Sequence, residues 1–198
     1  MIEFLNNNMS KPYELLRLKY SEALSNRQKL IEAVCISSFD LGKNEVDSRY
    51  VNLKFIDNED FIFFTNYDSP KSHQFKGHDQ ISATIYWQSI NTQIRLKAFI
   101  KKTSQEFNND YFIKRSANKN ALAISSNQSK IIQSFEDVKN KFNKVREDED
   151  LSICPEYWGG YSFKPYEIEF WEGNDFRLNK RNLFKRRNNS WDHFILEP

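Results

Sequence analysis

The sequence is poor in glycine, proline and cysteine, and it contains no long apolar run. Five Gly and five Pro among 198 residues argue against a long disordered linker. The two cysteines, Cys35 and Cys154, stand far apart without a Cys-x-x-Cys pair, so neither a disulfide nor a zinc site is expected. No stretch approaches the roughly 20 apolar residues that cross a bilayer, and the first residues lack a signal-peptide pattern. We therefore expect a cytoplasmic protein without a membrane partner.

Histidine and net charge are also scarce. His73, His78 and His193 show no metal-ligand spacing, so we expect no metal site. A net charge of +2 does not mark a general nucleic-acid binder. The glycine patterns GxGxxG and GxxxxGK[ST] are both missing, so a nucleotide would have to be held in another way.

Aromatic residues, by contrast, are abundant, with 17 Phe, nine Tyr and four Trp. They favour a β-rich core. Alternating apolar residues predict strands over 33–39, 49–56, 60–65, 81–87, 92–101, 166–171, 182–187 and 191–196. Helices are predicted over 12–27, 69–76 and 135–145, and one opening at Thr103, with a loop through 155–160 and a turn at 188–189. We expect a β-rich α+β fold, an antiparallel barrel with peripheral helices, as one domain over 11–198 after a flexible segment 1–10.

Two groups of polar residues lie on a predicted strand or directly after one. Arg49 and Lys54 are five apart, so a regular strand points them to opposite faces unless a bulge intervenes. Thr65 and Ser69-Pro70-Lys71 join a strand end to a helix start, where free N–H groups and hydroxyls suit a phosphate. The alternatives are a solvated strand face and a plain helix cap.

Two further groups lie closer to the C-terminus. The polar run 125–130 is either a solvated loop or a set of donors and acceptors for a heterocycle. The stretch from Trp171 to Arg181 combines an aromatic platform, a turn and two arginines four apart, which suit planar anions. Its basic continuation to Arg187 leaves a nucleic-acid patch open as an alternative.

Taken in order, these segments resemble the pyridoxamine 5'-phosphate oxidase family over nearly the whole chain. The landmarks are RYVNLK (49–54), FFTNYDSPK (63–71), YFIKRS (111–116), SSNQS (125–129), YWGGY (157–161) and IEFWEGNDFRLNKRNLFKR (168–186). The resemblance implies an FMN-binding split barrel and a homodimer with FMN at the subunit interface. It also implies oxidation of pyridoxine or pyridoxamine 5'-phosphate to pyridoxal 5'-phosphate, with molecular oxygen as the electron acceptor.

The resemblance also implies a role for individual residues. The FMN contacts would be Arg49, Lys54, Phe64, Thr65, Lys71, Gln93, Gln128, Ser129, Trp171 and Arg181. The substrate contacts would be Lys54, Tyr111, Arg115, Lys119 and Arg177. Arg177, which would cover the pyridine ring, and Asn179 are the candidate catalytic residues.

The chain departs from the family pattern at four places. Pro70 replaces a cation beside the flavin phosphate, Lys119 replaces a serine of the substrate site, and Asn179 replaces a histidine. The family's N-terminal Arg-Arg segment is not recognisable. An amide cannot titrate as an imidazole does, so the changes at Lys119 and Asn179 leave one alternative open, and the basic stretch Arg177–Arg187 leaves a second. One is a related flavin oxidase acting on another ring, such as a phenazine-type intermediate, and the other is a non-catalytic flavin or nucleic-acid binding module.

Overall fold

Strands β2 to β7 close into a ring in the computed structural model, which describes residues 1–198. The ring runs β3-β2-β5-β6-β7 and closes through β4, which pairs with both β3 and β7. Every pairing is antiparallel except that of β1 with β3. The strands are β1 Glu3–Leu5, β2 Ala33–Asp40, β3 Glu45–Asp57, β4 Asp60–Asn66, β5 Gln80–Trp87, β6 Thr92–Lys102, β7 Trp158–Glu172, β8 Lys180–Arg187 and β9 Ser190–Leu196. The expected β-rich α+β split barrel is therefore confirmed.

Alternation along the strands produces the core, because every second side chain points into the ring. In β6, Ile94, Leu96 and Ala98 are buried while the residues between them are more exposed. Aromatic rings fill the interior, and Phe61 stacks on Phe163 at 5.2 Å between centroids. One cluster of 26 buried residues runs from Ile2 to Phe184, and the single domain over 11–198 stays a prediction.

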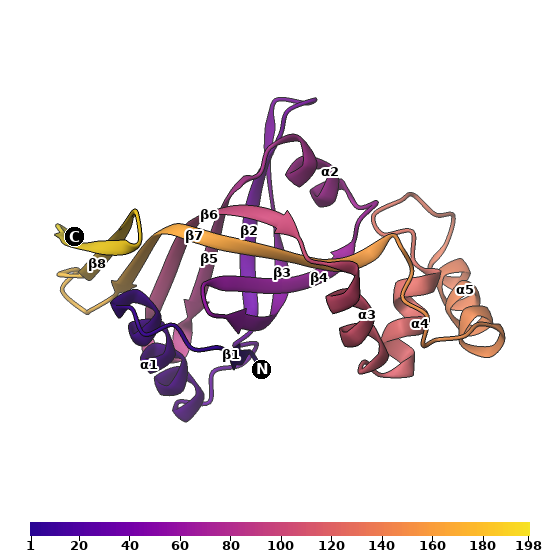
Figure 1. Cartoon of the computed structure of the whole chain (residues 1–198), viewed down its shortest axis with the longest axis horizontal. Helices are drawn as coiled ribbons and strands as arrows, with labels where there is room; N and C mark the ends of the chain where they lie inside the picture. Colours follow the sequence, from indigo (N-terminus) through magenta and orange to yellow (C-terminus); the bar gives the residue numbers. More distant parts are fainter.

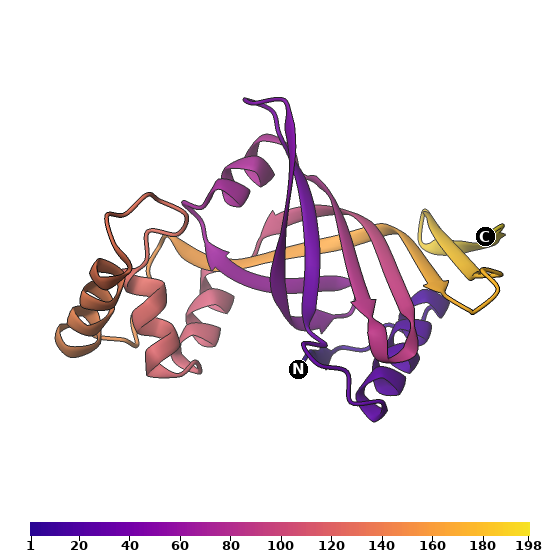
Figure 2. The same cartoon turned by 180° about the vertical axis from the view of Figure 1, so that it is seen from behind.

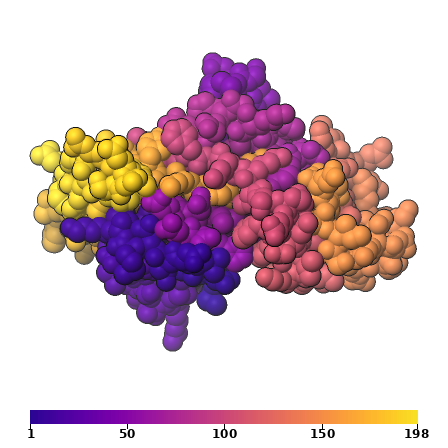
Figure 3. All heavy atoms as spheres, in the orientation of Figure 1, coloured from indigo at the N-terminus to yellow at the C-terminus, as the bar shows by residue number.

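The helices lie around the ring and at one end of the molecule (Figure 1). They are α1 Lys11–Ser25, α2 Pro70–Gly77, a short 3-10 turn η1 Gln88–Ile90, α3 Gln105–Ile113, α4 Ala117–Ser125 and α5 Phe135–Asp148. Helices α4 and α5 lie at one end and the β8–β9 hairpin at the other, seen from both sides in Figures 1 and 2. The long strand β7 runs between these two ends. The space-filling view shows the same separation of the two ends at the surface (Figure 3).

Several predicted boundaries differ from the structure. Glu3–Leu5 pair with β3, and the buried Ile2 N–H donates to the Tyr20 hydroxyl, so this part of 1–10 is packed rather than flexible. The capping residue of α3 is Ser104, which accepts from Phe107 N–H, and not Thr103, whose hydroxyl donates to a side chain. Helix α4 was not predicted, because it is as short as α2 and α3 but lacks the Ser-Pro or Thr-x-x-Glu pattern that marks where those two helices start.

Strand β7 begins at Trp158, so Gly159 and Gly160 belong to a strand and not to the predicted loop. A strand tolerates glycine where another group approaches the backbone closely. A Cβ on Gly159 would lie 2.2 Å from the Tyr67 hydroxyl and 2.4 Å from the Asn108 amide nitrogen. Gly159 therefore allows the Tyr67 and Asn108 side chains to pack directly on β7, and Gly160 does the same for the Thr103 side chain.

We expect Gly159→Ala to lower the free energy of unfolding by about 1–3 kcal/mol, because the new methyl group overpacks a closed contact. Denaturant titration of the purified protein measures this difference. Gly42→Ala is the matched control, because a Cβ there meets only the Asp40 carboxylate at 3.4 Å. Equal stability of the two variants would contradict the close-packing interpretation.

Candidate functional site

A cationic cavity of about 300 Å³ opens between β3, β4, the start of α2, and α3. Four of its lining residues are cations, namely Lys54, Lys71, Arg115 and Lys119, and no lining residue is a carboxylate. Its other lining residues are Tyr50, Val51, Asn52, Phe64, Thr65, Tyr111, Gln128 and Trp158. Uncompensated positive charge in a concave site favours an anionic ligand. We call this site the cationic cavity.

Lys71 forms one end of the cationic cavity. Its side chain is only 8% exposed, and its ammonium donates to the hydroxyls of Thr65 and Ser69, each at 3.2 Å. Ser69 occupies the predicted N-cap position of α2, but its hydroxyl donates to the Asn66 carbonyl instead of capping the helix. Burial, and secondly the positive charge of Arg49, lower the pKa of Lys71 to about 8. Lysine ammonium with hydroxyl partners and no ion pair is well placed to receive a phosphate.

A β-bulge places Lys54 in the cavity. Leu53 pairs with Phe63 and Phe55 pairs with Ile62, so Lys54 is the extra residue on β3. Burial lowers the pKa of Lys54, and the charges of Lys119 and Arg115 lower it further while Glu32 opposes them. Arg49 and Lys54 are five residues apart and could share a face of the strand only if a β-bulge lay between them or at one of them. Such a bulge is present at Lys54.

Arg49 itself does not line the cationic cavity. Its guanidinium donates to Ser38 Oγ at 2.6 Å and Gln74 Oε1 at 2.7 Å, and it pairs with Asp47 at 2.5 Å. Its charge nevertheless reaches Lys71, whose pKa it lowers. Arg49 therefore lies just behind the Lys71 end, and its contact with a ligand stays a prediction.

Arg115 and Lys119 form the other end of the cavity. The Arg115 guanidinium lies 4.2 Å from the centroid of the Trp158 ring, and its Nη2 donates to the Lys119 carbonyl at 3.0 Å. Its Nη1 is buried and has no hydrogen-bond partner. Burial lowers the pKa of Arg115 below its usual range. A buried donor without an acceptor is costly, so this atom is suited to an anion that enters the cavity.

An aromatic stack lies between the two ends. The Phe64 ring lies 4.0 Å from that of Tyr111 and 5.2 Å from that of Trp158, with interplanar angles of 20° and 10°. Sequence reasoning predicted Phe64 and Tyr111 but missed Trp158, which is 5% exposed. The YWGGY landmark contained Trp158, yet only the fold shows that it supports Arg115.

The residues of the polar run 125–130 line two different hollows. Gln128 lines the cavity, and its amide oxygen accepts from the Thr65 hydroxyl at 3.1 Å. Ser129 lies in a left-handed conformation and lines a separate hollow with Lys130 and Ile131. Of the predicted residues, the cavity thus gathers Lys54, Phe64, Thr65, Lys71, Tyr111, Arg115, Lys119 and Gln128.

Three other predicted residues lie in one row across the sheet, away from the cavity. Gln93 on β6 pairs with Trp171 on β7, which in turn pairs with Arg181 on β8. None of them lines the cationic cavity. Trp171 lies at the opposite end of β7 from Trp158, so this group belongs to the hairpin end of the molecule (Figure 1). We call Gln93, Trp171 and Arg181 the sheet-end group.

The loop between β7 and β8 carries the two candidate catalytic residues. Arg177 is exposed, has a positive φ of 59°, and does not line the cavity. Asn179 Oδ1 accepts from the Asn174 N–H at 3.4 Å. Phe176 and Leu178 expose 85% and 69% of their surface. The loop presents apolar and cationic side chains outward from the end that holds the sheet-end group.

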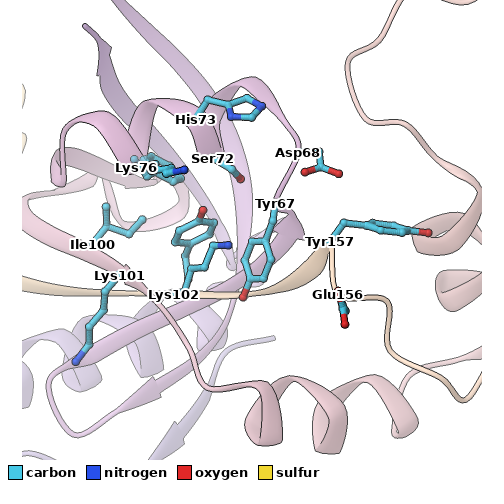
Figure 4. A pocket seen from close by; sticks show the side chains of 12 residues that line it. Tyr67, Asp68, Ser72, His73, Lys76, Ile100, Lys101, Lys102, Glu156 and Tyr157 are labelled. Atoms are coloured by element: carbon cyan, nitrogen blue, oxygen red, sulfur yellow. The ribbon is translucent and has the colours of Figure 1, made fainter.

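A larger hollow of about 580 Å³ lies on the other side of α2 (Figure 4). Lys76, Lys102 and His73 line it together with the carboxylates of Asp68 and Glu156. Opposite charges face one another there, and the Lys102 ammonium lies 3.8 Å from the centroid of the Tyr67 ring. This mixed-charge hollow contains none of the predicted site residues and has no excess of positive charge comparable to that of the cationic cavity.

The pKa of Lys71 predicts how anion binding depends on pH. Lys71 carries its charge below pH 8 and loses it as the pH rises through about 8. A bound phosphate stabilises the charged form, so anion affinity is greatest below this pH and decreases above it. We expect the dissociation constant of inorganic phosphate to rise by up to about tenfold per pH unit above 8. Isothermal titration calorimetry from pH 7 to 9.5 measures this, and Lys71→Met should remove most of the slope.

None of the helices combines the length and the apolar character that a bilayer-spanning segment needs.

Residues 158–198 match the model of the pyridoxine 5'-phosphate oxidase C-terminal dimerisation region. This segment contains β7, β8 and β9, and therefore both Trp158 and most of the sheet-end group.

Comparisons with curated proteins and solved structures give matches that cover nearly the whole chain. The pyridoxine/pyridoxamine 5'-phosphate oxidase of Legionella pneumophila is 34% identical over 94% of this chain and 87% of its own length. That of Leptospira biflexa is 35% identical over 94% of this chain and 89% of its length. PhzG from Burkholderia lata, in complex with tetrahydrophenazine-1-carboxylic acid, superposes with a TM-score of 0.87 at 24% identity, over 96% of this chain and 93% of its own. A pyridoxamine 5'-phosphate oxidase-related, FMN-binding protein of Nostoc punctiforme superposes with a TM-score of 0.78 at 14% identity, over 92% and 97%.

The two structural matches share the fold of this chain, and the two sequence relatives extend over nearly its full length. The landmarks found in the sequence lie on the walls of the cationic cavity and on the strands at the far end of the same sheet. The chain belongs to the pyridoxamine 5'-phosphate oxidase family of FMN-dependent oxidoreductases, which have the FMN-binding split-barrel fold.

Proposed function

We propose that this protein oxidises pyridoxine or pyridoxamine 5'-phosphate to pyridoxal 5'-phosphate, with FMN as its cofactor and oxygen as the electron acceptor. The observation that carries the proposal is the cationic cavity, with four cations, no carboxylate and a buried unpartnered Arg115 Nη1. Relatives named pyridoxine/pyridoxamine 5'-phosphate oxidase support the substrate class. Both the cofactor and the substrate carry a phosphate, and the cavity has cations at two ends.

The residues present fit FMN at the Lys71 end. The Lys71 ammonium and the Thr65 hydroxyl would meet its phosphate, and the neighbouring Arg49 charge would add to the attraction. Gln128 would offer its amide to the ring edge, and Ser129 lies on the same loop. When bound, FMN supplies the redox chemistry by accepting a hydride equivalent from the substrate and passing the electrons to oxygen.

The substrate phosphate would lie at the other end. Lys54, Tyr111, Arg115 and Lys119 line that side of the cavity, and the free Nη1 of Arg115 would gain an acceptor there. The protein's main contribution would be to fix the substrate ring against the flavin, because correct positioning replaces an improbable encounter. Trp158 would hold the Arg115 guanidinium in place through its ring face.

The site is proposed to be completed by a second copy of the chain in a homodimer. The sheet-end group lies apart from the cationic cavity within one chain, although the resemblance assigns both to one flavin. The match of residues 158–198 to a dimerisation region supports a partner that brings its sheet-end group to this cavity. Arg177 and Asn179 would then reach the substrate from the partner's β7–β8 loop.

A related flavin oxidase that acts on a different ring is the second candidate. Lys119 adds a charge to the substrate end, and Asn179 has no titratable proton. PhzG, which shares this fold, was solved with a tetrahydrophenazine carboxylic acid. The cations at the Arg115 end favour the phosphorylated substrate over this alternative.

A visible spectrum followed by a peroxide assay tests the proposal. The purified protein, loaded with FMN, should show flavin absorbance and release hydrogen peroxide with pyridoxine 5'-phosphate while forming the aldehyde. Unphosphorylated pyridoxine is the matched control and should react far more slowly. Bound FMN without turnover of either vitamin phosphate would reject the first candidate and leave the second.

A further inference from the structure

Carboxylates and cations alternate across the outer face of β6, β7 and β8. Glu167 lies between Lys97 at 3.0 Å and Lys185 at 3.5 Å. One pleat further along β7, Glu169 accepts from Arg95 Nη1 at 3.2 Å and from Arg181 Nε at 2.7 Å. Each of these carboxylates is thus held between two cations from neighbouring strands, but only Glu169 contacts a residue of the sheet-end group.

Glu169 differs from Glu167 in its burial and direction. It is only 7% exposed, and it faces Arg95 and Leu183 across the strands. Its carboxylate therefore reaches diagonally to Arg181, whose own cross-strand partner is Trp171. A buried carboxylate that is bonded to two guanidinium groups has little freedom to reorient.

The contacts of Arg181 leave one part of its guanidinium free. Nε is bound by Glu169, and Nη1 donates to the Glu197 carbonyl at 3.0 Å. Nη2 has no partner among the hydrogen bonds of the chain. The two fixed nitrogens set the plane of the guanidinium next to Trp171 on the neighbouring strand and leave the third nitrogen free to donate to a ligand.

We propose that Glu169 is a positioning residue for the flavin site, acting by fixing the Arg181 guanidinium in the orientation that contacts FMN. This rests on the proposed function, in which Arg181 binds the flavin held by the partner's cationic cavity. Orientation matters because a planar guanidinium binds well only when its donors are aligned with the acceptor. Glu169 itself does not contact the flavin.

The test compares Glu169→Gln with Glu167→Gln in the full-length protein. The two residues lie on the same strand and the same face, and each is flanked by two cations of its own, but Glu167 does not contact Arg181. We expect Glu169→Gln to raise the FMN dissociation constant about tenfold, measured by quenching of flavin fluorescence, while Glu167→Gln leaves it near the wild-type value. The thermal midpoint of each flavin-free variant is measured in parallel.

A double-mutant cycle with Arg181→Met separates positioning from a general structural effect. If Glu169 acts through Arg181, Glu169→Gln should weaken FMN binding no further in the Arg181→Met background. Additive effects, or equal dissociation constants for the Glu169 and Glu167 variants, would overturn the inference while leaving the proposed function intact. Wild-type protein that fails to bind FMN would instead remove the proposed function, and this inference with it.

Discussion

Lys71→Met is expected to weaken FMN binding about 100-fold, because it removes the most deeply placed cation of the cavity. Truncating one partner of a buried charge-assisted contact typically costs about 2–5 kcal/mol, and each 1.4 kcal/mol is tenfold in affinity. Lys71 is 8% exposed and its ammonium is bonded only to hydroxyls, so no ion pair neutralises its charge and the charge is available to the flavin phosphate. Equilibrium titration of the flavin-free protein with FMN, followed by fluorescence quenching, measures the change.

Lys76→Met is the matched control for this prediction. Lys76 lies on the same helix, is exposed, and faces the mixed-charge hollow instead of the cationic cavity (Figure 4). Its removal changes the net charge equally, so a nonspecific electrostatic effect would appear in both variants. Similar FMN affinities for the two variants would contradict the assignment of Lys71 to the flavin phosphate.

Arg115→Met is expected to lower kcat/KM for pyridoxine 5'-phosphate by about 100-fold or more, while FMN affinity stays within about twofold of the wild type. The guanidinium has a buried Nη1 without a partner, and the methionine side chain offers no donor to a phosphate. Methionine still fills space against Trp158, so the effect is one of recognition and not of packing. Initial rates of peroxide release at several substrate concentrations give the ratio.

The control for Arg115 is Lys114→Met, one residue away and exposed on the surface. It should leave both kcat/KM and FMN affinity unchanged. Loss of flavin in the Arg115 variant would show that this arginine belongs to the cofactor end of the cavity. An unchanged kcat/KM would exclude it from the substrate site.

The sequence predicted the barrel well because its signals are local. Strict alternation in 92–101 marks β6, and the Ser134 cap marks the start of α5, where its hydroxyl accepts from Asp137 N–H. It failed where tertiary contacts override local preference. Gly159 and Gly160 indicate a loop in isolation, but they lie in a strand, where Tyr67 and Asn108 occupy the space beside Gly159 and Thr103 occupies the space beside Gly160.

The candidate site was predictable only in part. The family resemblance named most residues of the cationic cavity, but it did not indicate that Arg115 rests on Trp158 or that Glu169 holds Arg181. Both contacts join residues from different elements, so no spacing along the chain reveals them. The division into a cavity and a sheet-end group likewise depends on how β7 spans the molecule, which only the fold shows.

The long strand β7 separates the cationic cavity from the sheet-end group within one chain. This separation predicts how a mixture of two inactive variants behaves. In the proposed homodimer each copy would supply the Lys71 part of one site and the Arg181 part of the other. A heterodimer of Lys71→Met with Arg181→Met chains would therefore concentrate both defects in one site and leave the second intact. Refolding the two inactive variants together should restore about a quarter of the wild-type activity, since about half of randomly formed dimers are mixed. A protein whose copies worked independently would show no such complementation.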